Sequence, residues 1–135
     1  MLELLATDPD PLVAAAAFKA AGAVGSPPAL VSLALAALTA GPAGGVPWQV
    51  RAAAAQALAA APPGIAVPPL SRAARDSHAD VRKAAVIALA GMSGHPAVTD
   101  TLQAAAADSD ADVRAYARRA TQQAKPERPK AAAHE

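Results

Sequence analysis

The amino-acid sequence predicts an all-α protein, a right-handed solenoid of about four stacked helix pairs. Two observations indicate this fold. The segment DSHADVRKAAVIAL at residues 76–89 is followed 32 residues later by a near copy, DSDADVRAYARRA at residues 108–120. In each copy, alanine stands four and seven positions after the valine of a Val-Arg pair. That spacing returns to one side of an α-helix, so each unit has an alanine-lined side that a neighbouring helix can approach closely.

The same valine anchor recurs along the chain. Val50, Val81 and Val113 each precede an arginine, and Val13 is a degenerate fourth anchor because Ala14 follows it. A leucine lies six residues before each of three turn aspartates, which predicts a helix A ahead of the Val-Arg helix B. One repeat domain is therefore expected over residues 1–124, with units at about 1–25, 26–62, 63–94 and 95–124.

In the first unit, helix A is expected over residues 1–7 and helix B from Asp10-Pro11 to about Val24. Asp10 can accept a hydrogen bond from a free N–H of the first turn, and Pro11 suits the first helical position because it has no N–H to satisfy. The leucines of residues 1–7 have no earlier repeat to cover them. We therefore expect either a longer repeat array or self-association through this N-terminal repeat.

The second unit contains an unusually long connection. Its helix A is expected at about residues 29–38 and its helix B at about 48–61. Between them, residues 39–47 form a linker that is rich in glycine and proline, and Thr39 stands where the other units have their turn aspartate. Insertions in solenoids often lie on a binding face, so this linker is a candidate contact region.

The third and fourth units follow the common pattern more closely. Because proline breaks a helix interior, the prolines at 62–63 and 68–69 are expected to frame a short helix A. The expected helices are about 69–75 and 79–92 in the third unit, and about 97–107 and 111–124 in the fourth. Residues 125–135 have the proline and charge content of a disordered tail.

These Asp, Val, Arg and Ala positions resemble HEAT repeats of the bacterial kind that also occurs in phycobilisome lyase subunits. The resemblance covers about residues 1–124 and implies a ladder in which turn aspartates pair with arginines of neighbouring units. A basic stripe for phosphate or an acidic partner is the alternative for the arginines. Because Thr39 replaces an aspartate, Arg51 is the arginine most expected to be unpaired. The expected ladder residues are Arg51, Asp76, Arg82, Asp108 and Arg114.

Composition limits the classes of protein to consider. The formal net charge of +1, from 12 basic and 11 acidic residues, gives no bulk electrostatic reason to expect nucleic-acid binding. The absence of cysteine excludes disulfides and cysteine-ligated metals and is typical of a reducing compartment. The N-terminal segment lacks the basic region of a signal peptide, and no apolar run reaches the roughly 20 residues of a membrane span. We expect a cytoplasmic protein without membrane contact.

No pattern predicts catalysis or metal binding. The acidic run at residues 108–112 begins like a calcium loop, but Val113 and Arg119 stand where that loop needs glycine and glutamate. These acids are better explained as a helix N-terminus. The glycine linker at residues 41–45 lacks the Gly-Lys-Ser/Thr ending of a phosphate-binding loop. We therefore expect no catalytic residue, no cofactor and no metal.

The expected partner-binding surface is the outward edge of the B helices, which lines the concave side in this fold. Trp48 is the only tryptophan, and tryptophan is enriched among interface hot spots; local packing under the linker is its alternative role. Val86 and Ile87 belong either to this edge or to the contact between repeats. The expected contact residues are Phe18, Lys19, Trp48, Gln56, Lys83, Val86, Arg118 and Arg119.

The favoured function is that of a non-catalytic scaffold, which presents a rigid curved surface to another protein or peptide. Nucleic-acid binding, as in HEAT-like DNA glycosylases, is an alternative with little support. The residues that support this alternative are Lys83, Arg118, Arg119, Lys125, Arg128 and Lys130. A third hypothesis, based on the family resemblance alone, is a lyase-like subunit that handles a bilin chromophore.

Overall fold

The computed structural model describes residues 2–124, and within them it contains helices and no strands. The predicted disordered tail at residues 125–135 lies outside the described residues. The helices are α1 (Leu2–Ala6), α2 (Pro11–Ala23), α3 (Pro28–Ala40), α4 (Trp48–Leu58), α5 (Pro63–Ala73), α6 (Ala79–Ala90), α7 (Pro96–Ala105) and α8 (Ala111–Ala124).

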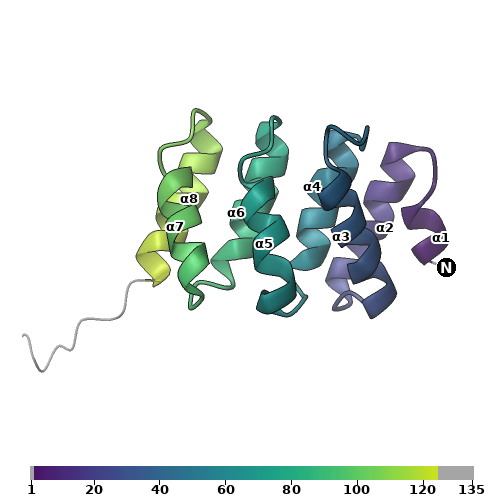
Figure 1. Ribbon diagram of the computed structural model, residues 1–135, viewed down its shortest axis with the longest axis horizontal. Helices are drawn as coiled ribbons and strands as arrows, with labels where there is room; N and C mark the ends of the chain where they lie inside the picture. The colour runs from purple at the N-terminus through teal and green to yellow at the C-terminus, as the bar shows by residue number, and fades with distance from the viewer. Residues whose placement is uncertain (1, 125–135) are drawn as a thin grey trace, which may run out of the picture.

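The helices form pairs that lie side by side in a row from α1 to α8 (Figure 1). The second helix of each pair contacts the second helix of the next, so α2, α4, α6 and α8 form one layer, here called the B layer. The first helices likewise contact one another, α1 with α3, α3 with α5, and α5 with α7, and form the A layer. The predicted stack of helix pairs is confirmed for the described part of the chain.

Polar caps set where three B-layer helices begin. The Oδ1 of Asp10 accepts a hydrogen bond from the N–H of Leu12 at 2.9 Å. The Nδ1 of His78 accepts one from the N–H of Asp80 at 3.1 Å. Asp110 caps α8 in the same manner, with two N–H donors of the first turn. Each cap satisfies a backbone donor that has no partner within its helix, so the helix starts follow from the sequence.

The core between the pairs consists mainly of alanine, with a few larger side chains. Ala54, Ala85 and Ala117, predicted to line the contact between helices, are all fully buried. Gly22 lies at a close contact of α2 with α4, because a Cβ at this position would lie 3.3 Å from the carbonyl oxygen of Gln56. Small residues thus allow α2 and α4 to approach backbone to backbone. The larger buried side chains include Phe18, Leu30, Leu58, Leu70 and Leu89.

The predicted boundaries of α5 are wrong. The helix begins at Pro63 rather than near residue 69, and it contains Pro68 and Pro69 in its interior. Each internal proline removes one backbone hydrogen bond. Packing compensates for this loss, because Val67 and Leu70 are buried on the side of α5 that faces the core.

The long linker begins after α3, which extends to Ala40 and therefore includes Thr39. Gly41 and Gly45 have φ values of 57° and 80°, in the left-handed region that glycine tolerates without strain. These two turns bring the chain back to Trp48 at the first position of α4. The linker thus places the only tryptophan of the chain at the start of a B-layer helix.

Candidate functional site

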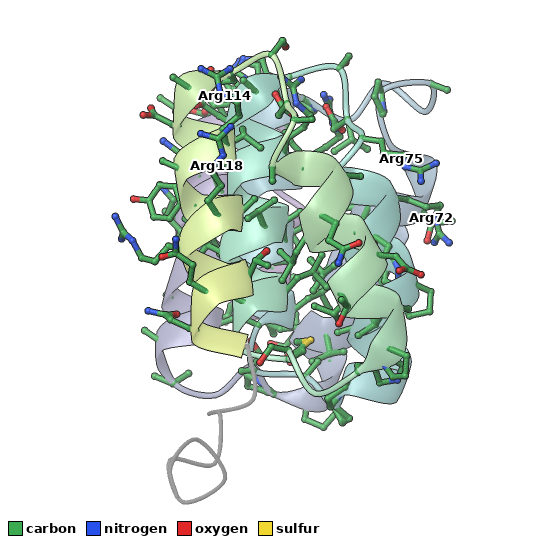
Figure 2. The ribbon with its side chains drawn as sticks, turned by 90° about the vertical axis from the view of Figure 1, so that its left-hand side faces the viewer. Arg72, Arg75, Arg114 and Arg118 are labelled. Carbon is green, nitrogen blue, oxygen red and sulfur yellow. The ribbon has the colours of Figure 1, made fainter. Side chains whose placement is uncertain are left out.

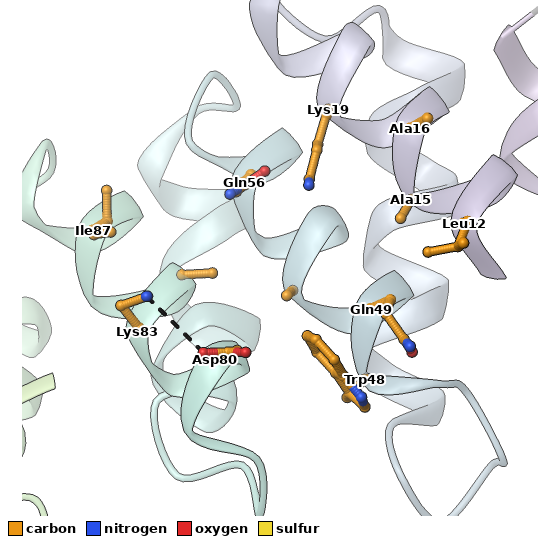
Figure 3. Close-up of a pocket in the computed structure, with 12 residues that line it drawn as sticks. Leu12, Ala15, Ala16, Lys19, Trp48, Gln49, Gln56, Asp80, Lys83 and Ile87 are labelled. Carbon is orange, nitrogen blue, oxygen red and sulfur yellow. Dashed lines mark ion pairs between the residues drawn. The ribbon is translucent and has the colours of Figure 1, made fainter. Parts of the chain in front are cut away.

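A groove of about 450 Å³ crosses the outer face of the B layer (Figure 3). It spans three consecutive helices of this layer, α2, α4 and α6, so no single repeat could form it. We call it the B-face groove. Its lining residues are Leu12, Ala15, Ala16, Lys19, Trp48, Gln49, Ala52, Gln56, Asp80, Lys83, Ala84 and Ile87.

The groove has a floor of small residues and a rim of long ones. Ala15 and Ala84 are buried in its floor, while Ile87 on its rim is 45% exposed. Lys19 and Gln56 occupy the same repeat position as Ile87, six residues after the anchor valine, and both are exposed. The repeat therefore aligns one exposed side chain from each of three helices along the groove.

Trp48 lies at one end of the groove and is held by a neighbouring repeat. Its ring is stacked on that of His78, with the centroids 4.1 Å apart and the planes 10° from parallel. The imidazole is fixed in turn, because its Nδ1 caps α6 through the N–H of Asp80. The indole is nevertheless 37% exposed. Trp48 thus packs against a neighbouring repeat and also presents accessible apolar surface.

Two amines give the groove its positive charge. Lys83 lies 4.0 Å from a carboxylate oxygen of Asp80 across one helical turn, an exposed pair of little energetic weight. Lys19 forms no ion pair within residues 2–124, and Figure 3 shows it pointing from α2 toward the space in front of Gln56. The lining therefore has two cations and one anion, together with exposed apolar surface.

Two ion pairs connect successive repeats at the turns between their A-layer and B-layer helices. Nε and Nη2 of Arg51 donate to the two carboxylate oxygens of Asp76, both at 2.8 Å. Arg82 makes the same bidentate contact with Asp108 at 2.9 and 3.1 Å. In each pair, the arginine of one B helix reaches the turn of the following repeat. The planar guanidinium suits this two-point contact in a way that lysine would not.

These contacts change the acidity of both aspartates. Burial alone raises the pKa of Asp76, but hydrogen bonds from Arg51 and from the N–H of His78, with the attraction of the guanidinium, outweigh it. The pKa therefore lies below its ordinary value. The pKa of Asp108 is lowered for the same reasons, with Arg82 and the N–H of Asp110 as donors. Both carboxylates are charged at neutral pH, which the ion pairs require.

The expectation that Arg51 is unpaired is wrong. Arg51 is 6% exposed, and in addition to Asp76 it donates to the carbonyl oxygen of Val46 in the linker. The direction of the contact explains the error, since each arginine pairs with the following repeat rather than with its own turn. An aspartate at position 39 would pair with the residue at position 14 of the first repeat. That residue is Ala14, so no arginine is left without a partner there. The ion pair that would connect the first repeat to the second therefore lacks both of its members.

The arginines of α8 lie apart from the groove. Figure 2 views the molecule from its α7–α8 end and shows Arg114 and Arg118 on α8. Arg119 lies over the ring of Tyr116, with its Cζ 5.5 Å from the ring centroid. Neither Arg118 nor Arg119 lines the B-face groove. Of the eight expected contact residues, the groove brings together Lys19, Trp48, Gln56 and Lys83.

The placement of Phe18 and Val86 on the outward edge is wrong. Phe18 is 1% exposed and Val86 is fully buried. Both stand five residues after the anchor valine, and this position faces the next repeat, whereas the position six residues after the anchor faces outward. A difference of one residue turns a side chain by about 100° on a helix, which separates the two environments.

The repeat pattern did not identify Leu12 and Asp80 as lining residues of the groove, or His78 as the residue that holds Trp48. His78 and Trp48 are 30 residues apart, and their contact depends on the alignment of two neighbouring repeats. The sequence does contain a signal for this contact, because Trp48 and His78 stand two and three residues before their anchor valines. Both therefore belong to the starts of adjacent B-layer helices, where side chains of neighbouring repeats meet.

The described residues contain no cluster of three or more His, Asp or Glu side chains that could hold a metal ion. Among the helices of residues 2–124, none combines the length and the apolar character that crossing a bilayer demands.

The repeat geometry and the Arg–Asp contacts agree with the comparison to protein families. The family model for HEAT repeats matches residues 36–122. The chain belongs to the HEAT repeat family. The matched range runs from α3 to α8 and excludes the first helix pair, whose Val13-Ala14 lacks the arginine of the later repeats. A comparison with curated proteins gives no match. HEAT repeats generally serve as protein-interaction scaffolds and are typically not catalytic.

Proposed function

We propose that this HEAT repeat protein is a non-catalytic scaffold whose B-face groove binds a segment of another protein. The observation that carries the proposal is the exposed indole of Trp48, fixed by His78 beside a floor of alanines. A rigid aromatic surface loses little conformational entropy when a partner covers it. The neighbouring Ile87, also exposed, extends the apolar surface across the groove.

The charges of the groove define the chemistry of the partner. A segment with one apolar side chain could place it against Trp48 and Ile87 while its carboxylates approach Lys19 and Lys83. Such complementarity mainly increases the rate of association and the specificity of the contact. Nucleic acid is a poorer fit, because Lys83 is near Asp80 and the arginines of α8 lie outside the groove. We therefore infer an acidic peptide segment with an apolar anchor as the partner.

Selection of peptides from a random displayed library on the wild-type protein tests this proposal. We expect the selected peptides to share an apolar residue flanked by Asp or Glu, and to lose most of their binding to Trp48→Ala and Ile87→Asp. The matched control is Ile65→Asp, because Ile65 is 47% exposed on α5 of the A layer, away from the groove. Equal binding to wild type and Trp48→Ala, with helical circular dichroism unchanged, would contradict the proposal.

We also propose self-association through the first helix pair, α1 and α2. Leu4 and Leu12 are 75% and 69% exposed on this pair, and exposed apolar side chains that gather on one face mark interaction sites. A second groove of about 370 Å³ lies on the same pair. It is lined by Leu2, Leu5, Leu12, Val13, Ala16, Ala17 and Ala20.

A further inference from the structure

In the Arg82–Asp108 pair, the turn of the arginine's own repeat holds the guanidinium as well. In Arg82, Nη1 donates to the carbonyl oxygens of Asp76 and Ser77 in its own turn, at 2.9 and 3.3 Å. This anchoring leaves the Nε–Nη2 edge of the guanidinium pointing away from the turn. Asp108 of the following repeat occupies that edge with both carboxylate oxygens.

Arg114 has the same anchoring and an open edge. Its Nη1 donates to the carbonyl oxygens of Asp108 and Ser109, at 2.8 and 3.0 Å. Within residues 2–124, no carboxylate forms a hydrogen bond or ion pair with its Nε or Nη2. Arg114 is therefore preorganised to bind one more aspartate in the geometry already present twice in the molecule.

Asp8 is the matching half at the other end of the row. Its Oδ1 accepts the N–H of Asp10 at 2.8 Å, just as Asp76 accepts that of His78 at 2.9 Å. This bond fixes the carboxylate in the orientation that Asp76 and Asp108 use to bind arginine. Among the described residues, no arginine or lysine pairs with Asp8. Within the described residues, the ladder thus has an unpaired aspartate at one end and an unpaired arginine at the other.

We propose that two copies of the chain associate head to tail, with Arg114 of one copy bound to Asp8 of the next. This inference rests on the proposed self-association and specifies its geometry. The apolar surfaces support it, because Val13, Ala16 and Ala20 of α2 occupy the repeat positions that α4 buries as Val50, Ala53 and Ala57. The first helix pair therefore offers the same kind of face that the inner repeats use for stacking.

Arg118 weakens the proposed contact between α8 of one copy and the first helix pair of the next. It stands at the repeat position of the buried Val86, so a docked copy would cover part of its side chain. The aliphatic stem can lie on alanine, but the guanidinium must remain hydrated at the edge or find a partner. We therefore expect a weak, salt-sensitive association. Because the two ends differ, repeated contacts produce open chains of molecules rather than a closed dimer.

Sedimentation velocity of the 135-residue chain, from about 10 µM to about 1 mM at low salt, tests this proposal. We expect the average size to rise with concentration for the wild type. Asp8→Ala and Arg114→Ala should each weaken association at least about tenfold, since each leaves one charge unpaired. The double variant Asp8→Arg/Arg114→Asp should restore part of it, because the opposite charges are kept while both local anchors are lost. Arg118→Val, which introduces the residue of the inner repeat, should strengthen it.

Arg119→Ala is the matched control. Arg119 lies on the same helix as Arg114, but it packs over the ring of Tyr116 and is no member of the Arg–Asp ladder. Association that Asp8→Ala and Arg114→Ala leave unchanged would overturn the Arg114–Asp8 contact while supporting self-association by another route. A wild type and an Arg118→Val variant that both remain monomeric at about 1 mM would overturn both proposals. Circular dichroism of each variant establishes that the helices are retained.

Discussion

The carboxylates of Asp76 and Asp108 each bind two parts of the chain at once. One oxygen of Asp76 accepts the N–H of His78 within its own turn, and both oxygens accept from Arg51 of the preceding repeat. Asp108 does the same with the N–H of Asp110 and with Arg82. A single charged group thereby fixes a turn and connects two repeats, so its protonation affects both.

The pH dependence of stability should reveal this role. Folding lowers the pKa of Asp76 below its ordinary value of 3.8. The stabilisation is therefore fully present above the pKa of the unfolded chain and is lost as the pH falls through the lower pKa of the folded protein. Denaturant unfolding should show a free energy that declines below about pH 4 for the wild type. Asp76→Asn should be less stable at pH 7 and should decline less steeply.

The control for this experiment is Asp100→Asn. Asp100 is exposed on α7 and forms no ion pair within residues 2–124. Its replacement should leave the decline at acidic pH as steep as in the wild type. If Asp76→Asn and the wild type lose stability in parallel as the pH falls, the ion pair with Arg51 does not contribute to acid sensitivity.

At this scale, the sequence predicts which residues form the ladder better than it predicts their neighbours. The repeat spacing identifies Arg51, Arg82, Asp76 and Asp108, because each recurs at a fixed distance from an anchor valine. It does not give the direction of the contact, which depends on how successive repeats are stacked. The environment of Phe18 was predicted wrongly for a related reason, since one residue along a helix separates an exposed position from the contact between repeats.

Helix starts could be predicted because each depends on local chemistry. Asp10 and Asp110 accept hydrogen bonds from N–H groups two or three residues later, an arrangement that one turn of chain determines by itself. The start of α5 could not be predicted in this way. Its internal prolines argue against a helix locally, and only burial of Val67 and Leu70 against neighbouring repeats decides in its favour.

Replacing an internal proline of α5 should therefore stabilise the protein. Pro68 is exposed, so Pro68→Ala removes no core contact and supplies an N–H that can donate to the carbonyl of Gly64. We expect the free energy of unfolding to rise by about 1 kcal/mol, because the proline also restricts the unfolded chain and part of the gain is cancelled. Thermal and denaturant unfolding would measure it.

Pro63→Ala is the matched control, because Pro63 is at the first position of α5, where no intrahelical donor is needed. This variant should show no gain in stability. A loss of stability in Pro68→Ala would mean that α5 is bent around its prolines in a form that alanine does not retain.

The row of helix pairs predicts a gradient of local stability across the whole molecule. The helices α4 and α6 each contact a B-layer helix on both sides, whereas within residues 2–124 α8 has such a neighbour on one side only. In a stacked array, stability is approximately a sum of repeat and neighbour contributions. Amide hydrogen exchange should therefore be at least about tenfold slower in α4 and α6 than in α1 and α8. Equal protection along residues 2–124 would instead indicate unfolding as a single unit.

The architecture as a whole follows from the period of the sequence, whereas the B-face groove does not. The period fixes helix pairs and their order, because each unit can bury its apolar side only against the next. The groove depends on three repeats at once, and its floor is open because Ala15, Ala52 and Ala84 are small where their helices meet. No segment of the sequence contains this arrangement by itself.

The stacking of Trp48 on His78 has a practical consequence. The chain has a single tryptophan, and its indole lines the B-face groove in direct contact with an imidazole. All indole fluorescence of the protein therefore originates at the candidate binding site, where emission responds to solvent and to ring contacts. The molecule has its own optical reporter of groove occupancy, and no dye needs to be attached to observe binding.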